Sequence, residues 1–154
     1  MDIKYKYLIL IAINCFLTFI TQVIYNYTPA HDSIQFLHLA KQYNNFHFFN
    51  APAYCYGHMF YSIFLFTIGT LINYHHYVIG FIQSLFFGCS LLFLIKELEA
   101  YLNRNLLGIT VLLILIPEIN LFNGYILSES LTFSLILLLF GVALRICNNN
   151  LSII

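Results

Sequence analysis

Two carboxylates stand out in this sequence because each lies at the edge of an apolar run long enough to cross a membrane. Asp32 follows the first apolar run, and Glu129 opens the last one, roughly a hundred residues later. Acidic groups at membrane boundaries are costly to bury and often mark functional sites. A carboxylate held at the mouth of a membrane cavity can take a proton from a hydroxyl group, so Asp32 is a candidate general base.

Each of these carboxylates also has a purely structural interpretation. Asp32 with Gln35 three residues later has the form of a capping box, and Asp is a favoured residue at a helix N-cap. Glu129 follows Ser128 at the start of an expected helix, where a negative charge suits the helix dipole. The local sequence around each acid favours a capping role. The occurrence of two acids at membrane boundaries favours a functional role. Glu118 is a weaker candidate, because a carboxylate near a helix end can simply reach water.

The composition indicates an integral membrane protein. Of 154 residues, 61% are hydrophobic and only 8% are charged, whereas soluble domains carry about 25% charged residues. Basic and acidic residues balance at six each, so no bulk charge points to nucleic acid. Long apolar runs with few charges predict an all-α protein with several transmembrane helices.

The apolar runs predict about four spans separated by one long polar interval. The expected spans are 7–25, 77–95, 106–123 and 129–147, with Pro117 near the end of the third. In the polar interval, a helix from about Ser33 to Tyr43 is too short to span and is expected to lie along the membrane surface. Residues 56–73 are apolar enough to cross but rich in Gly, His and Thr.

The placement of basic residues decides how residues 56–73 are interpreted. If they do not cross, five of the six Lys and Arg residues lie on the cytoplasmic side, as the positive-inside rule requires: Lys4, Lys6, Lys96, Arg104 and Arg145. We therefore expect a cytoplasmic N-terminus and a long first extracytoplasmic loop that carries juxtamembrane helices. Asp32, Glu118 and Glu129 then share the face opposite the cytoplasm. No internal repeat or linker divides residues 1–154, which we interpret as one membrane module.

Other polar residues give weaker signals. His31 and His58 are candidates for binding phosphate or donating protons, against the alternative of ordinary interfacial histidines. No histidine shows the spacing of a zinc motif, and the cysteines predict neither a metal site nor a disulfide. Gln83 and Ser84 lie inside an expected span and are interpreted as polar groups in helix packing.

Four stretches together resemble the N-terminal part of the GT-C superfamily of membrane glycosyltransferases. They are HDSIQFLHLAKQYNNF (31–46), APAYCYGHMFYSIFLFTIG (51–69), IQSLFFGCSLLFLIKEL (82–98) and LIPEINLFNGYILSESLTFSLILLL (115–139). The nearest branch resembles protein-mannosyltransferase-like and aminoarabinose-transferase-like enzymes. That family carries an acid in the first extracytoplasmic loop and a second acid that opens a later span. Where the family has two acids in that loop, this chain has His31 and Asp32.

The resemblance implies transfer of a sugar from a polyprenyl phosphate to an acceptor on the extracytoplasmic face of a bacterial inner (plasma) membrane. It gives Asp32 the role of base. Glu129 would orient the acceptor or, with Asp32, hold a divalent cation, Mg²⁺ or Mn²⁺. His31, Lys41 and His58 would face the lipid phosphate, because the leaving group departs as an anion.

Members of this family carry many more spans than this sequence predicts. We therefore expect residues 1–154 to be the N-terminal portion of a larger GT-C fold, which works with a missing C-terminal half or a second subunit. The competing hypothesis is a small non-catalytic membrane protein, either a decayed or split glycosyltransferase fragment or an assembly subunit.

Overall fold

The computed structural model describes residues 3–24, 31–43, 59–125 and 128–151. Within these ranges every regular element is a helix, which confirms the expected all-α class. The helices are α1 (Ile3–Ile24), α2 (His31–Tyr43), α3 (Met59–Ile72), α4 (His76–Leu102), α5 (Leu107–Leu115), α6 (Pro117–Gly124) and α7 (Ser128–Leu151).

Three of these helices are long and apolar enough to cross a membrane by themselves: α1, α4 and α7. The pair α5 and α6 passes the same test jointly but is bent by 59°. The chain is therefore an integral membrane protein with three spans, or four if the bent pair counts as one. With 27 residues, α4 is about 40 Å long and runs beyond the expected end of its span at residue 95, because the charged segment KELEAYL continues the helix.

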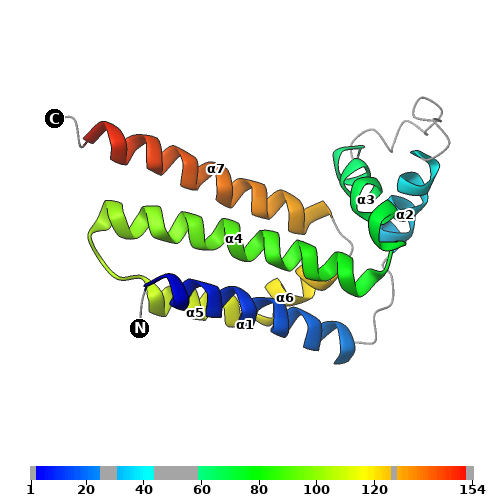
Figure 1. Cartoon of the computed structure of the whole chain (residues 1–154), viewed down its shortest axis with the longest axis horizontal. Coiled ribbons are helices and arrows are strands. Elements are labelled where there is room, and N and C mark those ends of the chain that lie inside the picture. Colours follow the sequence, from blue (N-terminus) through cyan, green and yellow to red (C-terminus); the bar gives the residue numbers. More distant parts are fainter. Residues whose placement is uncertain (1–2, 25–30, 44–58, 126–127, 152–154) are drawn as a thin grey trace.

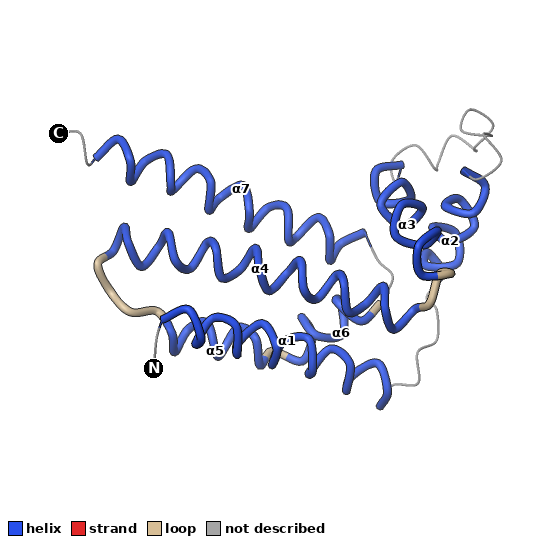
Figure 2. The backbone as a smooth tube through the Cα atoms, viewed as in Figure 1, coloured by secondary structure: helices blue, strands red, loops and turns tan. Residues whose placement is uncertain are grey.

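The long helices lie side by side, with α4 between α7 and α1 (Figure 1). Both chain termini lie at one end of this bundle, which we call the terminal end (Figure 1). Helices α2 and α3 lie at the opposite end, near the start of α7, and we call this the juxtamembrane end. The tube in Figure 2 shows that the described connections between the helices are short. The helix that carries Asp32 and the start of the helix that carries Glu129 thus lie at the same end of the molecule.

Helices α2 and α3 form a pair that packs on the start of the bundle. Phe36 of α2 meets Tyr61 of α3 edge to face, with ring centroids 5.0 Å apart. Both rings belong to a buried cluster that also holds Ile79 of α4 and Leu131 of α7. The 14 residues of α3 extend only about 21 Å, shorter than the roughly 30 Å hydrocarbon layer. The described length of α3 agrees with the expectation that residues 56–73 do not cross, which stays a prediction.

The turn between α3 and α4 is tight and strained. Asn73 and Tyr74 both have positive φ angles, 52° and 55°, which are unfavourable for a bulky side chain. The Tyr74 N–H donates to the Gly69 carbonyl oxygen at 3.1 Å. A Cβ atom on Gly69 would collide with the Tyr74 ring, so glycine is required at this position.

The third expected span is not a continuous helix, so that prediction was wrong in one respect. Proline has no N–H to continue the helix, and α6 starts anew at Pro117 after the extended residue Ile116. The Asn120 side chain compensates for the break, because its Nδ2 donates to the carbonyl oxygens of Ile114 at 2.9 Å and Ile116 at 3.1 Å. A bend with an identifiable cause thus replaces a straight span.

Asn120 also joins a buried polar core between α1, α4 and α6. Asn14 Nδ2 donates to the carbonyl oxygen and the hydroxyl of Ser84, both at 2.8 Å. The Thr18 hydroxyl lies 2.9 Å from the Ser84 hydroxyl and 3.3 Å from Asn120 Oδ1. Ser84 is therefore a polar group in helix packing, as predicted. These bonds hold α6 against α1 in a setting that offers no water as an alternative partner.

Gln22 completes this polar core at the juxtamembrane end. Its Nε2 donates to the Gly124 carbonyl oxygen at 2.7 Å. The Gln22 side chain also lies directly against Gly80 of α4, where a Cβ atom would collide with the amide. Two glycines on two different helices thus make room for one buried amide.

Candidate functional site

The start of α7 opens into a pocket of about 330 Å³ between α4, α6 and α7. Its walls are mainly apolar, and two carboxylates, Glu118 and Glu129, line it together. We call it the carboxylate pocket. Its lining residues are Phe87, Glu118, Ile119, Phe122, Asn123, Glu129, Ser130 and Phe133.

Each carboxylate reaches the pocket from the first turn of a helix. Glu118 follows Pro117 at the start of α6, and Glu129 follows Ser128 at the start of α7. Both side chains are exposed, and the Ser128 hydroxyl donates to Glu129 Oε2 at 3.3 Å. The sequence ranked Glu118 below Glu129, yet the fold brings the two residues to the same pocket.

Two buried polar residues form the wall behind these acids. Asn123 and Ser130 are only 2% and 3% exposed, and the Ser130 hydroxyl donates to Asn123 Oδ1 at 2.7 Å. The Asn123 Nδ2 donor is buried and has no hydrogen-bond partner among the described residues. An unpaired buried donor is unfavourable by about 1–3 kcal/mol. A ligand oxygen in the pocket would relieve this cost.

Asp32 and His31 lie in the first turn of α2, and their side chains are outside the described part of the structure. The helix begins two residues earlier than the expected start at Ser33, so Asp32 is within the helix rather than before it. His58 is also outside the described residues. What the structure adds is the position of their helix: Phe36 of α2 and Leu131 of α7 share one buried cluster.

Lys41 lies in the last turn of α2, about 13 Å along the helix axis from Asp32. Its ammonium group is 5.4 Å from the centroid of the Tyr74 ring, in the range of a cation–π contact. Burial raises the pKa of the Tyr74 phenol, which keeps this side chain neutral beneath the lysine. Lys41 is thus positioned at the α3–α4 turn, away from the start of α2.

Among the residues that the structure describes, no three His, Cys, Asp or Glu side chains gather closely enough to hold a metal ion. Glu118 and Glu129 are the two carboxylates that line the carboxylate pocket. A divalent cation there would need further ligands from the substrate or from elsewhere in the protein.

The sequence analysis missed the polar core and Asn123. One signal was available, because Asn14, Thr18 and Gln22 recur every fourth residue and so share one face of the first span. Asn123 offered no such signal. Its importance depends on the bend at Pro117 and on the neighbouring α7, and neither is visible in the local sequence.

In comparisons with known proteins, no family model matches the chain, and no curated protein or solved structure is significantly similar to it.

Proposed function

We propose that this chain is a module of a membrane glycosyltransferase that takes a sugar from a polyprenyl phosphate and transfers it to an acceptor hydroxyl. The observation that carries the proposal is the shared buried cluster of α2 and α7, because it brings together two helices that each carry an acid in the first turn. The carboxylate pocket lies beside that cluster, and Leu131 of the cluster follows Ser130 of the pocket.

The pocket suits a lipid-linked substrate. Its apolar walls, which include Phe87, Phe122 and Phe133, match an isoprenoid chain. The carboxylates can accept hydrogen bonds from the hydroxyl groups of the sugar, and the unpaired Asn123 donor can bind an oxygen of the same molecule. A pocket that is apolar with a few polar groups at one side is typical of sites for amphipathic small molecules.

In the proposed reaction the Asp32 carboxylate takes the proton of the acceptor hydroxyl as its oxygen attacks the anomeric carbon of the sugar. The bond between that carbon and the phosphate oxygen breaks, and the polyprenyl phosphate leaves as an anion. Glu129 orients the acceptor or holds a divalent cation. His31, Lys41 and His58 are the candidates to balance the phosphate charge, and the 13-residue length of α2 favours His31 over Lys41 near Asp32.

The proposal places the juxtamembrane end outside the cytoplasm, in a bacterial inner membrane, with the N-terminus inside. Further spans or a second subunit would complete the donor site, since the described cations at this end are few. The competing hypothesis, a non-catalytic membrane protein, shares the fold but gives the two acids no chemical role.

The deciding experiment measures sugar transfer from a labelled polyprenyl-phosphate donor in membranes that contain the chain with its completing partner. Replacing Asp32 with Asn keeps a polar side chain of the same size in the first turn of α2 but removes the proton acceptor. Loss of general-base assistance lowers the rate about 10²–10⁴-fold. Glu97→Gln is the matched control, because Glu97 lies near the far end of α4, outside the carboxylate pocket. Unchanged turnover in Asp32→Asn would refute the catalytic role and favour the non-catalytic alternative.

A further inference from the structure

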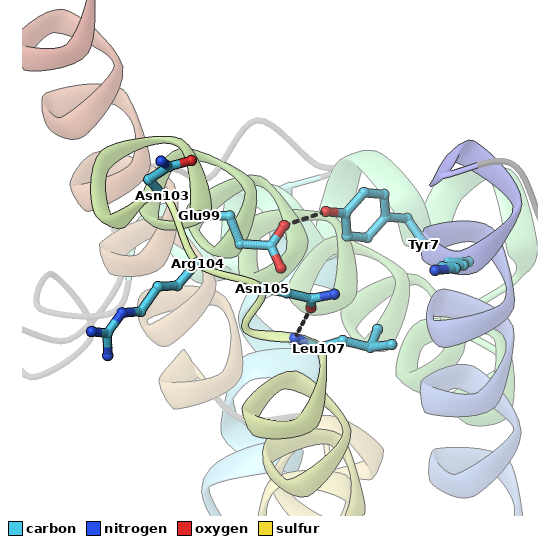
Figure 3. A pocket seen from close by; sticks show the side chains of 7 residues that line it. Tyr7, Glu99, Asn103, Arg104, Asn105 and Leu107 are labelled. Carbon is cyan, nitrogen blue, oxygen red and sulfur yellow. Dashed lines mark hydrogen bonds between the residues drawn. The ribbon is translucent and has the colours of Figure 1, made fainter.

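A second pocket lies at the terminal end of the bundle, far from the carboxylate pocket. It has a volume of about 290 Å³ and is formed by the first turns of α1, the last turn of α4 and the loop that leads into α5. We call it the basic pocket, and Figure 3 shows its side chains. Its lining residues are Lys6, Tyr7, Glu99, Asn103, Arg104, Asn105 and Leu107.

The one acid of this pocket is already committed to structural hydrogen bonds. Glu99 Oε2 accepts a hydrogen bond from the Tyr7 hydroxyl at 2.7 Å (Figure 3). Glu99 Oε1 accepts one from the Leu106 N–H at 2.8 Å. These bonds tie α1, α4 and the α5 loop together, so the wall of the pocket is built in advance of any ligand.

The two cations of the pocket are not committed in this way. Lys6 and Arg104 have no ion pair among the described residues, and the Arg104 side chain points away from the Glu99 carboxylate (Figure 3). With one acid and two bases, the lining carries a net positive charge. The exposed Arg104 side chain must turn toward the cavity to reach a ligand there, and it then offers, with Lys6 on another helix, two cations for the oxygens of a phosphate group.

Neutral donors strengthen this match. Asn105 Oδ1 accepts from the Leu107 N–H at 2.8 Å, which fixes the side chain and leaves its amide donors without a described partner. Leu107 is the first residue of α5, and the positive end of a helix dipole favours anions. Asn103 has a left-handed backbone, with φ of 50°, which turns the chain sharply at the end of α4.

The length of α4 places the pocket at the depth of the lipid headgroups. Helix α4 is about 40 Å long and the hydrocarbon layer about 30 Å thick, so the last turns of α4 reach the headgroup layer. Lys96 and Arg145 belong to the same end and also satisfy the positive-inside rule, but neither lines the pocket. The positive-inside rule explains basic residues at this end but does not explain a cavity. Lys6 and Arg104 differ from Lys96 and Arg145 because they line one.

We propose that the basic pocket binds a phosphate group, supplied either by the headgroup of an anionic phospholipid or by a soluble phosphate. The site is independent of the proposed transfer reaction and lies at the opposite end of the bundle. Glu99 has two effects on phosphate binding. Its negative charge repels the phosphate, and its hydrogen bonds hold the wall of the pocket in place.

The test uses the full chain in a non-ionic detergent with three probes: phosphatidylglycerol, phosphatidylcholine with the same acyl chains, and inorganic phosphate. Binding is measured by native mass spectrometry and by the shift in Tm. The double variant K6Q/R104Q should weaken binding of the preferred probe at least about 10-fold, as expected for lost charge-assisted hydrogen bonds. The matched control K96Q/R145Q removes the same charge at the same end and should change binding less than about 2-fold.

The outcomes separate clearly. Preference for phosphatidylglycerol over the other two probes identifies a lipid headgroup, and binding of inorganic phosphate identifies a soluble ligand; either supports the site. Equal losses in the two double variants would show diffuse surface charge and overturn it. Failure of the wild-type chain to bind either phosphatidylglycerol or inorganic phosphate better than phosphatidylcholine would also overturn it. Circular dichroism of each variant checks that the helices are intact, and the single variant K6Q replaces the double variant if the latter unfolds.

Discussion

Replacing Asn120 with Leu should destabilise the bundle more than the same change at the neighbouring buried asparagine, Asn123. Asn120 donates two hydrogen bonds to the carbonyls exposed by the break at Pro117, at 2.9 Å and 3.1 Å. It also accepts a longer bond of 3.3 Å from Thr18. Leucine has a similar size and no polar atom, so it removes all three bonds without leaving a large cavity.

The magnitude follows from what each partner loses. The Ile116 carbonyl keeps a long bond of 3.4 Å from the Asn120 backbone N–H, and Thr18 keeps its contact with Ser84. The buried Ile114 carbonyl therefore bears most of the loss. An unsatisfied buried group costs about 1–3 kcal/mol, and other hydrogen bonds between membrane helices contribute about 0.6 kcal/mol each. We expect the free energy of unfolding to fall by about 2–3 kcal/mol.

Asn123 is the matched control because it lies on the same helix and is equally buried. Its Nδ2 has no described partner, and its Oδ1 accepts only from Ser130 at 2.7 Å. A serine hydroxyl in a helix can turn to a backbone carbonyl instead. Leucine at 123 should therefore cost less than about 1 kcal/mol.

The assay is unfolding in mixed micelles by titration with SDS, followed by far-UV circular dichroism because the chain contains no tryptophan. The ranking of the two variants is the readout, since it does not depend on the absolute scale of the titration. If Asn123→Leu is as destabilising as Asn120→Leu, the repair of the helix break by Asn120 is not what stabilises α6.

Two further predictions concern stability and topology. Gly80→Val should lower the Tm, because a side chain at 80 collides with the Gln22 amide, and overpacking typically costs about 1–3 kcal/mol. The control Gly108→Ala faces open space on α5 and should raise the Tm slightly, because alanine favours a helix more than glycine does. For topology, cysteines placed at the exposed positions His38 and Asn103 in a cysteine-free background should differ in labelling by an impermeant thiol reagent. The cysteine at 38 should react from outside the cell and the one at 103 only after permeabilisation; the reverse pattern would invert the proposed orientation.

The spans were predictable from sequence because the hydrocarbon thickness fixes how long an apolar run must be. Their ends were less predictable. Helix α4 continues through Lys96, Glu97 and Glu99 to Leu102, since a helix can extend into the headgroup layer once its residues can reach water. Hydropathy reports the part of a helix inside lipid and says little about the part beyond it.

From the distribution of basic residues we expected the two acids on one face of the membrane, which stays a prediction. The structure places α2 and the start of α7 at one end of the bundle (Figure 1). Side-chain geometry was beyond sequence reasoning. Glu118 joins Glu129 at one pocket only because α6 turns away from α5 at Pro117, and the local sequence does not fix the angle or the direction of that turn. Composition on its own predicts one straight span there.

The bend at Pro117 is therefore the feature on which the carboxylate pocket depends. Helix α6 has eight residues and is about 12 Å long, so a rotation of 59° displaces its far end by about 12 Å from the position it would have in a straight span. That displacement exceeds the typical distance between packed helices, about 8–10 Å. Without the bend, Phe122 and Asn123 would lie away from Glu129 and Ser130, and the hydrogen bond between Ser130 and Asn123 could not form. The polar core that fixes α6 to α1 is thus a condition for the pocket, and a variant that straightens the span should lose ligand binding there even with both carboxylates intact.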